Sequence, residues 1–259
     1  MSRFINLELG GESEDQSQAQ QKALVKDEAY YLHEARAAFE NGNFEPALRF
    51  YSKVLEFNPQ NAAAWTAQVR MLIELEEFRE ARLWADKALE RFPREPELLA
   101  AKAVALARAG DLQGALAFSD ASIEERGDTP YVWLARGDVL LARKEHRADY
   151  CFEKALLLAP RDWFVAWLAA RIRLYYHQFV LALKLLQQAI EWNAGHFLLW
   201  LESGQCQQAL GLIGPAENSF LQAQQLNPQC READQALLRL SQTGWWRRAC
   251  GWWRQLFKP

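Results

Sequence analysis

Residues 62–93 read AAAWTAQVRMLIELEEFREARLWADKALERFP, and this stretch decides the fold. Its apolar residues recur every three or four positions in two runs, which predicts two amphipathic helices joined by a tight turn. Phe78 is the first apolar residue after the turn, and the small residue Ala81 lies in the second run. Pro93 ends the unit, because proline cannot continue a helix. The stretch is therefore expected to form one helical hairpin.

The same pattern returns along the chain with a nearly constant period. A small residue recurs at intervals of 34, 34, 33, 34 and 34, at Ala47, Ala81, Ala115, Ala148, Ala182 and Ala216. Twelve residues after each of these alanines stands a helix-ending or small residue: Pro59, Pro93, Gly127, Pro160, Ala194 and Pro228. A fixed period in this range indicates a solenoid of stacked helical hairpins.

Each unit also has room for an earlier helix that carries its own small residue, at Ala35, Val69, Ala103, Gly137, Ala170 and Gly204. In five of the six units a bulky residue stands four positions before it: Tyr31, Trp65, Leu99, Trp133 and Trp200. The interval from Gly137 to Ala148 is eleven residues, where every other unit has twelve. We expect the fourth hairpin turn to absorb this deletion without shifting either helix.

These units resemble the tetratricopeptide repeat. The resemblance rests on two sets of residues: Trp65, Val69, Leu72, Phe78, Ala81, Ala88 and Pro93, and again Trp200, Gly204, Ala216, Phe220, Ala223 and Pro228. It implies an all-α, right-handed superhelical solenoid of six helix-turn-helix repeats with a C-terminal capping helix. It also implies a scaffold for protein interaction, which is what the family shares.

The repeats divide the chain into nine segments. An N-terminal extension, mostly disordered before the first helix starts, occupies residues 1–27. The six repeats are expected at 28–61, 62–95, 96–129, 130–162, 163–196 and 197–230. A capping helix at 231–242 and a basic, tryptophan-rich tail at 243–259 follow them.

Composition and motifs exclude several classes of function. The 259 residues carry a formal net charge of -3, whereas a general nucleic-acid binder is normally basic. No stretch approaches the roughly 18 consecutive apolar residues of a membrane-spanning helix, and the start has no signal-peptide run, so a cytoplasmic protein is expected. Phosphate-loop, nucleophile-elbow and paired-histidine metal motifs are missing from the sequence. We therefore expect no catalysis, no cofactor and no metal site.

The resemblance implies that the first helices line a concave groove that binds a protein or peptide. Aromatic residues concentrate in the fourth and fifth repeats, which favours an apolar or aromatic peptide ligand. The alternative is that these aromatic side chains belong to the core between helices. The candidate groove residues are Arg36, Arg70, Tyr131, Leu134, Asp138, Phe164, Trp167, Arg171, Leu174, Tyr175 and Gln205.

The tail from Thr243 to Pro259 reads TGWWRRACGWWRQLFKP, with four tryptophans, four basic residues and no acid. On a helix its apolar residues share one broad face and its basic residues the other, which is typical of a helix lying in a membrane interface on anionic lipid. Two alternatives are that the tail packs on the repeats or docks on a separate protein. Its candidate contact residues are Trp245, Trp246, Arg247, Arg248, Trp252, Trp253, Arg254, Leu256, Phe257 and Lys258.

These observations predict a non-catalytic adaptor that binds a protein segment in its groove and is tethered peripherally to a membrane by the tail. The alternative is a soluble subunit of a larger cytoplasmic complex, with the tail packed on the repeats or on a partner.

Overall fold

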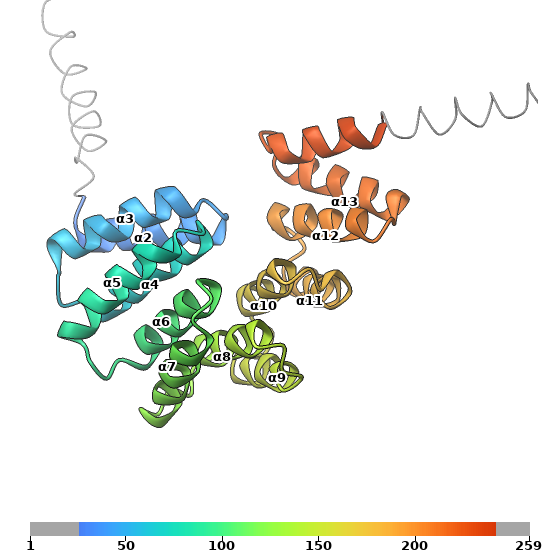
Figure 1. The fold of residues 1–259 in the computed structure, drawn as a ribbon. Helices are drawn as coiled ribbons and strands as arrows, with labels where there is room; N and C mark the ends of the chain where they lie inside the picture. Colours follow the sequence, from blue (N-terminus) through green and yellow to red (C-terminus); the bar gives the residue numbers. More distant parts are fainter. Residues whose placement is uncertain (1–25, 242–259) are drawn as a thin grey trace, which may run out of the picture.

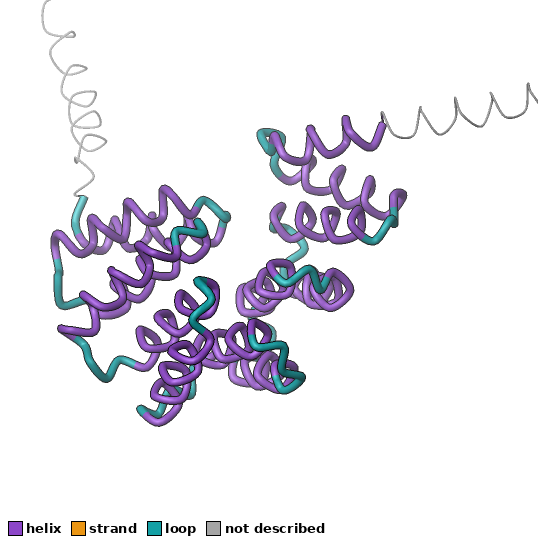
Figure 2. The backbone as a smooth tube through the Cα atoms, viewed as in Figure 1, coloured by secondary structure: helices purple, strands orange, loops and turns teal. Residues whose placement is uncertain are grey.

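The computed structural model describes residues 26–241, so the predictions for the N-terminal extension before residue 26 and for the tail lie outside it. Within these residues the chain is a series of antiparallel helix pairs and contains no strand (Figures 1 and 2). The pairs are α2 (Glu28–Glu40) and α3 (Phe44–Phe57), α4 (Ala62–Glu74) and α5 (Phe78–Arg91), α6 (Pro96–Arg108) and α7 (Leu112–Glu124), α8 (Pro130–Ala142) and α9 (Ala148–Leu158), α10 (Trp163–Tyr175) and α11 (Phe179–Trp192), and α12 (Phe197–Ala209) and α13 (Ile213–Leu226).

A further helical stretch at 231–241 follows the sixth pair. The pairs follow one another from α2 to α13 along a curved path (Figure 1). The prediction of an all-α repeat solenoid is confirmed.

Polar side chains mark where several of the first helices begin. Asp27, Asn61, Thr129 and Asp162 each accept a hydrogen bond from a backbone N–H in the first turn of the helix that follows. Such caps satisfy amides that have no partner inside the helix. Pro96 and Pro130 occupy first-turn positions, where the missing N–H is not needed.

The turn inside every pair places one residue in the left-handed backbone region. Three of these residues are glycines, Gly42, Gly110 and Gly211, with φ between +71° and +93°. The other three are Glu76, Lys144 and His177, at φ between +55° and +61°. A left-handed residue costs roughly 1–2 kcal/mol unless it is glycine, so the tight turn recurs even where the sequence disfavours it.

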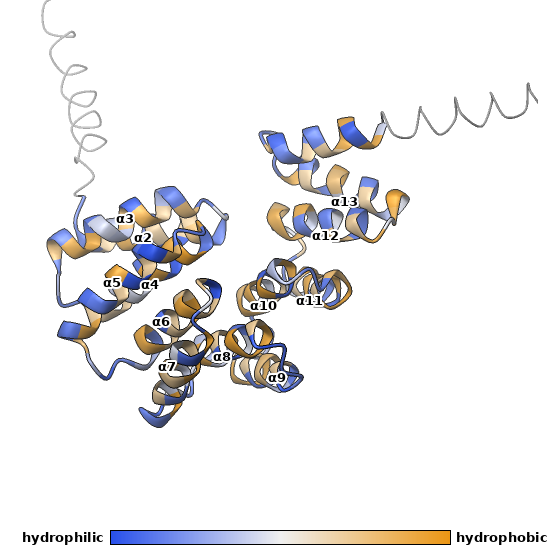
Figure 3. Ribbon diagram, in the orientation of Figure 1, coloured by the Kyte–Doolittle hydropathy of each residue, from blue (hydrophilic) through white to orange (hydrophobic). Residues whose placement is uncertain are grey.

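Small residues allow the two helices of a pair to approach closely. The alanines that recur in the second helices, from Ala47 to Ala216, are buried in all six pairs. Gly204 on α12 faces Phe220 on α13, and a Cβ atom on Gly204 would lie 2.6 Å from the phenylalanine ring. Each helix carries both hydrophobic and hydrophilic residues (Figure 3), as expected when its apolar face packs against neighbouring helices.

The fourth pair departs from the expectation that its turn alone absorbs the deletion. Helix α9 begins at Ala148 and has 11 residues, whereas α3, α5, α11 and α13 have 14 and begin three residues before the corresponding alanine. The deletion therefore removes the first turn of the second helix. A hollow of about 650 Å³ lies at this place, bordered by Leu141, Asp149, Tyr176 and Leu181 among others.

Candidate functional site

The concave side of the solenoid is built from the first helices of the pairs and carries an unusual set of buried charges. We call Glu74, Arg108, Asp138, Arg171 and Glu202 the inner ion network. Arg108 on α6 donates to Asp138 on α8 through two nitrogens, Nη2 at 2.7 Å and Nε at 3.2 Å from Oδ2. The hydroxyl of Tyr176 donates to the other carboxylate oxygen at 2.7 Å. Asp138 is thus fully buried and paired.

Arg171 on α10 links two further helices. Its Nη2 lies 2.7 Å from Glu74 Oε2 on α4, and its Nη1 lies 2.7 Å from Glu202 Oε1 on α12. The indole Nε1–H of Trp167 donates to the second oxygen of Glu202 at 2.8 Å. One guanidinium therefore connects the second, fifth and sixth pairs, and both of its carboxylate partners are accounted for.

The two carboxylates that share Arg171 differ in their acidity. Burial alone would raise the pKa of Glu74, but Arg171 and Arg108 outweigh it and hold that pKa below its ordinary value. Burial raises the pKa of Glu202, and Arg171 only partly compensates because Glu74 repels the same charge. Glu74 lies near more cations than Glu202 does, which explains why the pKa values of the two carboxylates shift in opposite directions.

Side chains from the first two pairs contact the fifth and sixth pairs across the concave side. The ring of Phe39 on α2 meets the ring of Phe164 edge-on, with centroids 5.1 Å apart. The guanidinium of Arg171 lies 4.6 Å from the centroid of Phe44. A Cβ atom on Gly42 would lie 3.0 Å from Leu198 on α12. The solenoid's curvature therefore brings its early and late repeats into contact.

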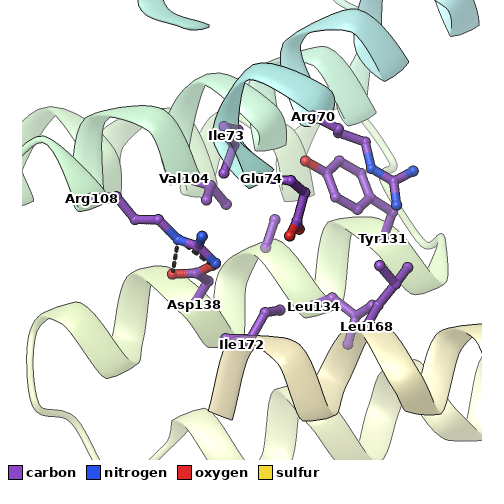
Figure 4. A pocket seen from close by; sticks show the side chains of 11 residues that line it. Arg70, Ile73, Glu74, Val104, Arg108, Tyr131, Leu134, Asp138, Leu168 and Ile172 are labelled. Carbon is purple, nitrogen blue, oxygen red and sulfur yellow. Dashed lines mark hydrogen bonds and ion pairs between the residues drawn. The ribbon is translucent and has the colours of Figure 1, made fainter. Parts of the chain in front are cut away.

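A small hollow remains beside the inner ion network. Side chains of α4, α6, α8 and α10 converge on it (Figure 4), and its volume is about 30 Å³, room for roughly two waters. A second hollow of about 170 Å³ adjoins it at Glu74 and Arg108 and is bordered by Leu174 and Tyr175. The apolar residues around the first hollow are Ile73, Val104, Leu134, Ala135, Leu168 and Ile172.

Arg70 differs from the other cations of this face. Its guanidinium carbon lies 3.9 Å from the ring centroid of Tyr131 and 5.0 Å from that of Phe39. Within residues 26–241 no carboxylate forms an ion pair with it, whereas Arg108 and Arg171 are both paired. Arg70 is therefore a half-buried cation, held by two rings, that still offers hydrogen-bond donors.

The structure places the predicted groove residues in three environments. Arg36 and Gln205 are exposed, and Arg36 pairs with Glu40 on its own helix. Arg70, Tyr131, Phe164, Arg171, Leu174 and Tyr175 are partly buried along the concave side. The remaining three, Leu134, Asp138 and Trp167, are buried.

The prediction that Trp167 is accessible in the groove is wrong. Its side chain has no exposed surface, because the rings of Phe39 and Phe164 cover it and Glu202 accepts its indole hydrogen. Leu134 and Asp138, each about 1% exposed, likewise present no surface to a ligand. The alternative stated for the aromatic cluster, a place in the core, is correct for Trp167.

Sequence reasoning missed three members of the inner ion network: Glu74, Arg108 and Glu202. A signal for two of them was present. Glu74 stands four residues after Arg70, a predicted groove residue, so the two share a helical face, and Arg108 stands one repeat of 34 residues after Glu74. Glu202 stands three residues before Gln205, but its pairing with Arg171 becomes visible only when α10 and α12 are placed side by side.

The depressed pKa of Glu74 predicts acid sensitivity. A carboxylate with a folded-state pKa below its unfolded value contributes stability above that range and loses it as the pH falls. Glu202, whose folded-state pKa is raised, acts in the opposite direction and moderates the loss. We expect the urea midpoint to fall between about pH 5 and about pH 3, and to fall less in Glu74→Gln than in wild type.

The matched control for this titration is Glu56→Gln. Glu56 forms an exposed ion pair with Lys53, which should contribute little. Equal acid-induced falls in Glu74→Gln and Glu56→Gln would show that the Glu74–Arg171 pair adds no pH-dependent stability.

Comparison with known proteins agrees with the repeat pattern. A family model described as tetratricopeptide repeat matches residues 38–105, the part of the chain that holds α3, α4 and α5. The matched residues therefore carry tetratricopeptide repeats, and the helix pairs on either side of them have the same architecture. No curated protein matches this chain.

Several solved structures are similar to this chain at low sequence identity, and those with a TM-score above 0.5 show the same fold. A tetratricopeptide repeat protein from Parabacteroides merdae has a TM-score of 0.53 at 16% identity, and the match covers 89% of this chain and 90% of that one. The human IFIT1 dimer with m7Gppp-AAAA has a TM-score of 0.51 at 18% identity, over 89% of this chain and 59% of that one. The APC/C hetero-tetramer Cut9-Hcn1 has a TM-score of 0.48 at 15% identity, over 87% and 52%. The chain thus spans between half and two thirds of the last two.

The described residues lack two other features. Among residues 26–241, no helix combines the length and apolar character needed to cross a bilayer. In the same residues, no three histidine, cysteine or acidic side chains are grouped so that they would hold a metal ion.

Proposed function

We propose that this tetratricopeptide repeat protein is a non-catalytic adaptor whose concave face binds a peptide segment that combines an acidic group with apolar side chains. The proposal rests on Arg70. Its guanidinium is fixed over Tyr131 at the edge of an apolar hollow and has no carboxylate partner within the described residues. A carboxylate of a ligand would give Arg70 the kind of ion-pair partner that Asp138 gives Arg108.

The size of the hollow restricts how such a segment would bind. A volume of about 30 Å³ does not admit a peptide side chain, so the ligand would lie over the rim formed by Arg70 and Tyr131. The adjoining hollow of about 170 Å³ beside Leu174 and Tyr175 is the larger of the two on this face. We infer that the acidic group contacts Arg70 while apolar groups cover the rim and this second hollow.

The charges of the concave face favour a peptide over a nucleic acid. The human IFIT1 structure carries a capped RNA, so the fold itself does not exclude such a ligand. Here, however, Arg70, Arg108 and Arg171 are balanced by Glu74, Asp138 and Glu202. A face without excess positive charge gains little from a row of phosphates.

A displayed library of random peptides tests the proposal with the full chain as bait. We expect enriched sequences to contain aspartate, glutamate or a free C-terminal carboxylate next to apolar residues. Arg70→Gln should weaken binding of an enriched peptide by about 10- to 100-fold, the range for losing a hydrogen bond to a charged group.

The matched control is Arg49→Gln, because Arg49 is exposed on a second helix and pairs with Glu45 on that helix. Binding that is reduced equally by Arg70→Gln and Arg49→Gln would indicate general charge attraction. Enriched peptides without any acidic group would contradict the assigned role of Arg70.

Tethering to a membrane through the tail is a second candidate part of the function, and it rests on the tail's composition alone. Each basic residue near an anionic surface contributes about 1 kcal/mol to the free energy of membrane binding, so the four basic residues of the tail would add substantially to it. They are Arg247, Arg248, Arg254 and Lys258. If it is correct, the full chain should float with phosphatidylserine vesicles at low salt. Replacing the four basic residues with glutamine should then remove most of the salt dependence.

A further inference from the structure

The last described helix has an apolar side chain in an unexpected place. Residues 231–241 are helical and begin one full repeat after the start of α12 at Phe197. Ala233 and Leu240 are buried, but Leu238 is 60% exposed. Leu238 stands one full repeat after Gly204, the residue of α12 that faces Phe220 in the second helix of its own pair. Helix 231–241 is therefore placed as the first helix of a pair, and residues 26–241 contain no second helix for it.

The tail continues the repeat pattern in one register. Gly244 stands 33 residues after Gly211, which has φ +77° in the turn of the sixth pair. Ala249 stands 33 residues after Ala216, the same shortened interval that separates Ala115 from Ala148. In this register residues 246–259 correspond to α13 (Ile213–Leu226).

In this register two bulky apolar residues of the tail fall on positions that are buried in all six described pairs. Trp253 falls on the position four residues after the recurring alanine, and Leu256 on the position seven residues after it. Both positions are buried in all six pairs, where they hold Tyr51, Ala85, Ser119, Phe152, Leu186 and Phe220, and Val54, Ala88, Ser122, Ala155, Ala189 and Ala223.

The tail's basic residues fall on exposed positions in the same register. Arg247 corresponds to Glu45, Arg79, Gln113, His146, Val180 and Gly214, and Lys258 to Glu56, Glu90, Glu124, Leu157, Glu191 and Gln225; all twelve are exposed. An interval longer by one residue would put Arg254 on the position of Phe220, which has no exposed surface. Of these two registers, only the shorter keeps the tail's basic residues off the buried positions.

We propose that residues 245–259 form the second helix of a seventh pair and pack on the exposed apolar side of helix 231–241. Ala249, Trp253 and Leu256 then face inward. The pairing goes beyond the proposed adaptor function, because it gives the tail a place in the array. The rest of the chain carries a net charge of -7, which favours a tail of charge +4 on its own repeats. A tail packed in this way cannot also insert all four tryptophans into a membrane.

The seventh pair differs from the others at one contact. Leu238 replaces the alanine, valine or glycine of the other first helices, and Trp253 is larger than any residue at its position. Gly204 allows α12 to approach Phe220 on α13 closely. Leu238, at the equivalent position of the seventh pair, would hold its two helices farther apart. The seventh pair is therefore expected to pack less closely than the sixth.

Hydrogen exchange of the full chain without lipid tests the pairing. Amides of helix 231–241 should be protected in wild type and should exchange about tenfold faster or more in Trp253→Ala and in Ala249→Glu, because both changes remove the second helix. The matched controls are Trp245→Ala and Arg247→Glu, whose positions are exposed in nearly all pairs, and they should retain wild-type protection.

The outcomes separate the pairing from the other roles of the tail. Because a repeat packs mainly on its neighbours, loss of the terminal pairing should leave α4 and α10 intact, and unchanged exchange there confirms that the variants are folded. Equal exchange of 231–241 in wild type, Trp253→Ala and Trp245→Ala overturns the pairing. So does protection that appears only with phosphatidylserine vesicles and depends on Trp245 and Trp253 alike, which would instead place the tail on a membrane.

Discussion

Trp167→Ala is expected to lower the free energy of unfolding by about 3–5 kcal/mol, the cost of deleting a large buried aromatic side chain. Trp167 has no exposed surface and packs against Phe39 and Phe164. Its loss leaves a cavity at the contact between the first and fifth pairs, and it also removes the donor to Glu202. Urea unfolding of the purified variant, followed by far-UV circular dichroism, measures the change.

Two further variants separate the contributions in this prediction. Trp167→Phe keeps an aromatic ring but leaves Glu202 without the indole donor, so its cost should be about 1–3 kcal/mol and smaller than that of alanine. Trp200→Ala is the matched control, because Trp200 is a partly exposed tryptophan in the next pair. If Trp167→Ala costs no more than Trp200→Ala, the indole is not part of the core that the structure shows.

The repeat architecture could be predicted from the sequence because its signals are local and recur in all six units. The nearly constant repeat interval, small residues at helix contacts and turn residues such as Gly42 and Gly211 can all be recognised one hairpin at a time. The shortened α9 shows the limit of such reasoning. The interval from Gly137 to Ala148 locates the deletion, but whether a turn or a helix end gives way depends on the packing around Ala148.

The concave site was predicted only in part, because it depends on how far the solenoid curves. Charges at Arg70, Asp138 and Arg171 were expected on the inner face, and the structure places them there or close to it. Trp167 was expected to be accessible and is covered by Phe39, which belongs to the first pair and lies far earlier in the chain. No local pattern encodes that approach, since it results from small rotations added from one repeat to the next.

The buried pair of Arg108 and Asp138 is expected to produce the other large effect. Both side chains are nearly inaccessible, at 6% and 1% exposure, so removing one partner leaves a charge in a site of low polarity. We expect Arg108→Met to cost about 3–5 kcal/mol. Asp138→Leu should cost less. In the intact protein Asp138 and Glu74 together raise the pKa of Arg108 against the lowering effect of burial, and in this variant Glu74 remains beside the guanidinium.

The double variant Arg108→Met/Asp138→Leu decides whether the pair stabilises the fold or only fixes its arrangement. Two apolar residues of similar volume avoid the cost of desolvating two charges, so the double variant should recover most of the stability lost in Arg108→Met. Tyr176 then loses its carboxylate acceptor but retains the backbone oxygen at position 138, 3.2 Å away. Urea unfolding of the four proteins gives the coupling energy, which should be at least about 2 kcal/mol in favour of the intact pair. Additive single effects would mean that Arg108 and Asp138 are each solvated independently, and the ion network would then not join α6 to α8.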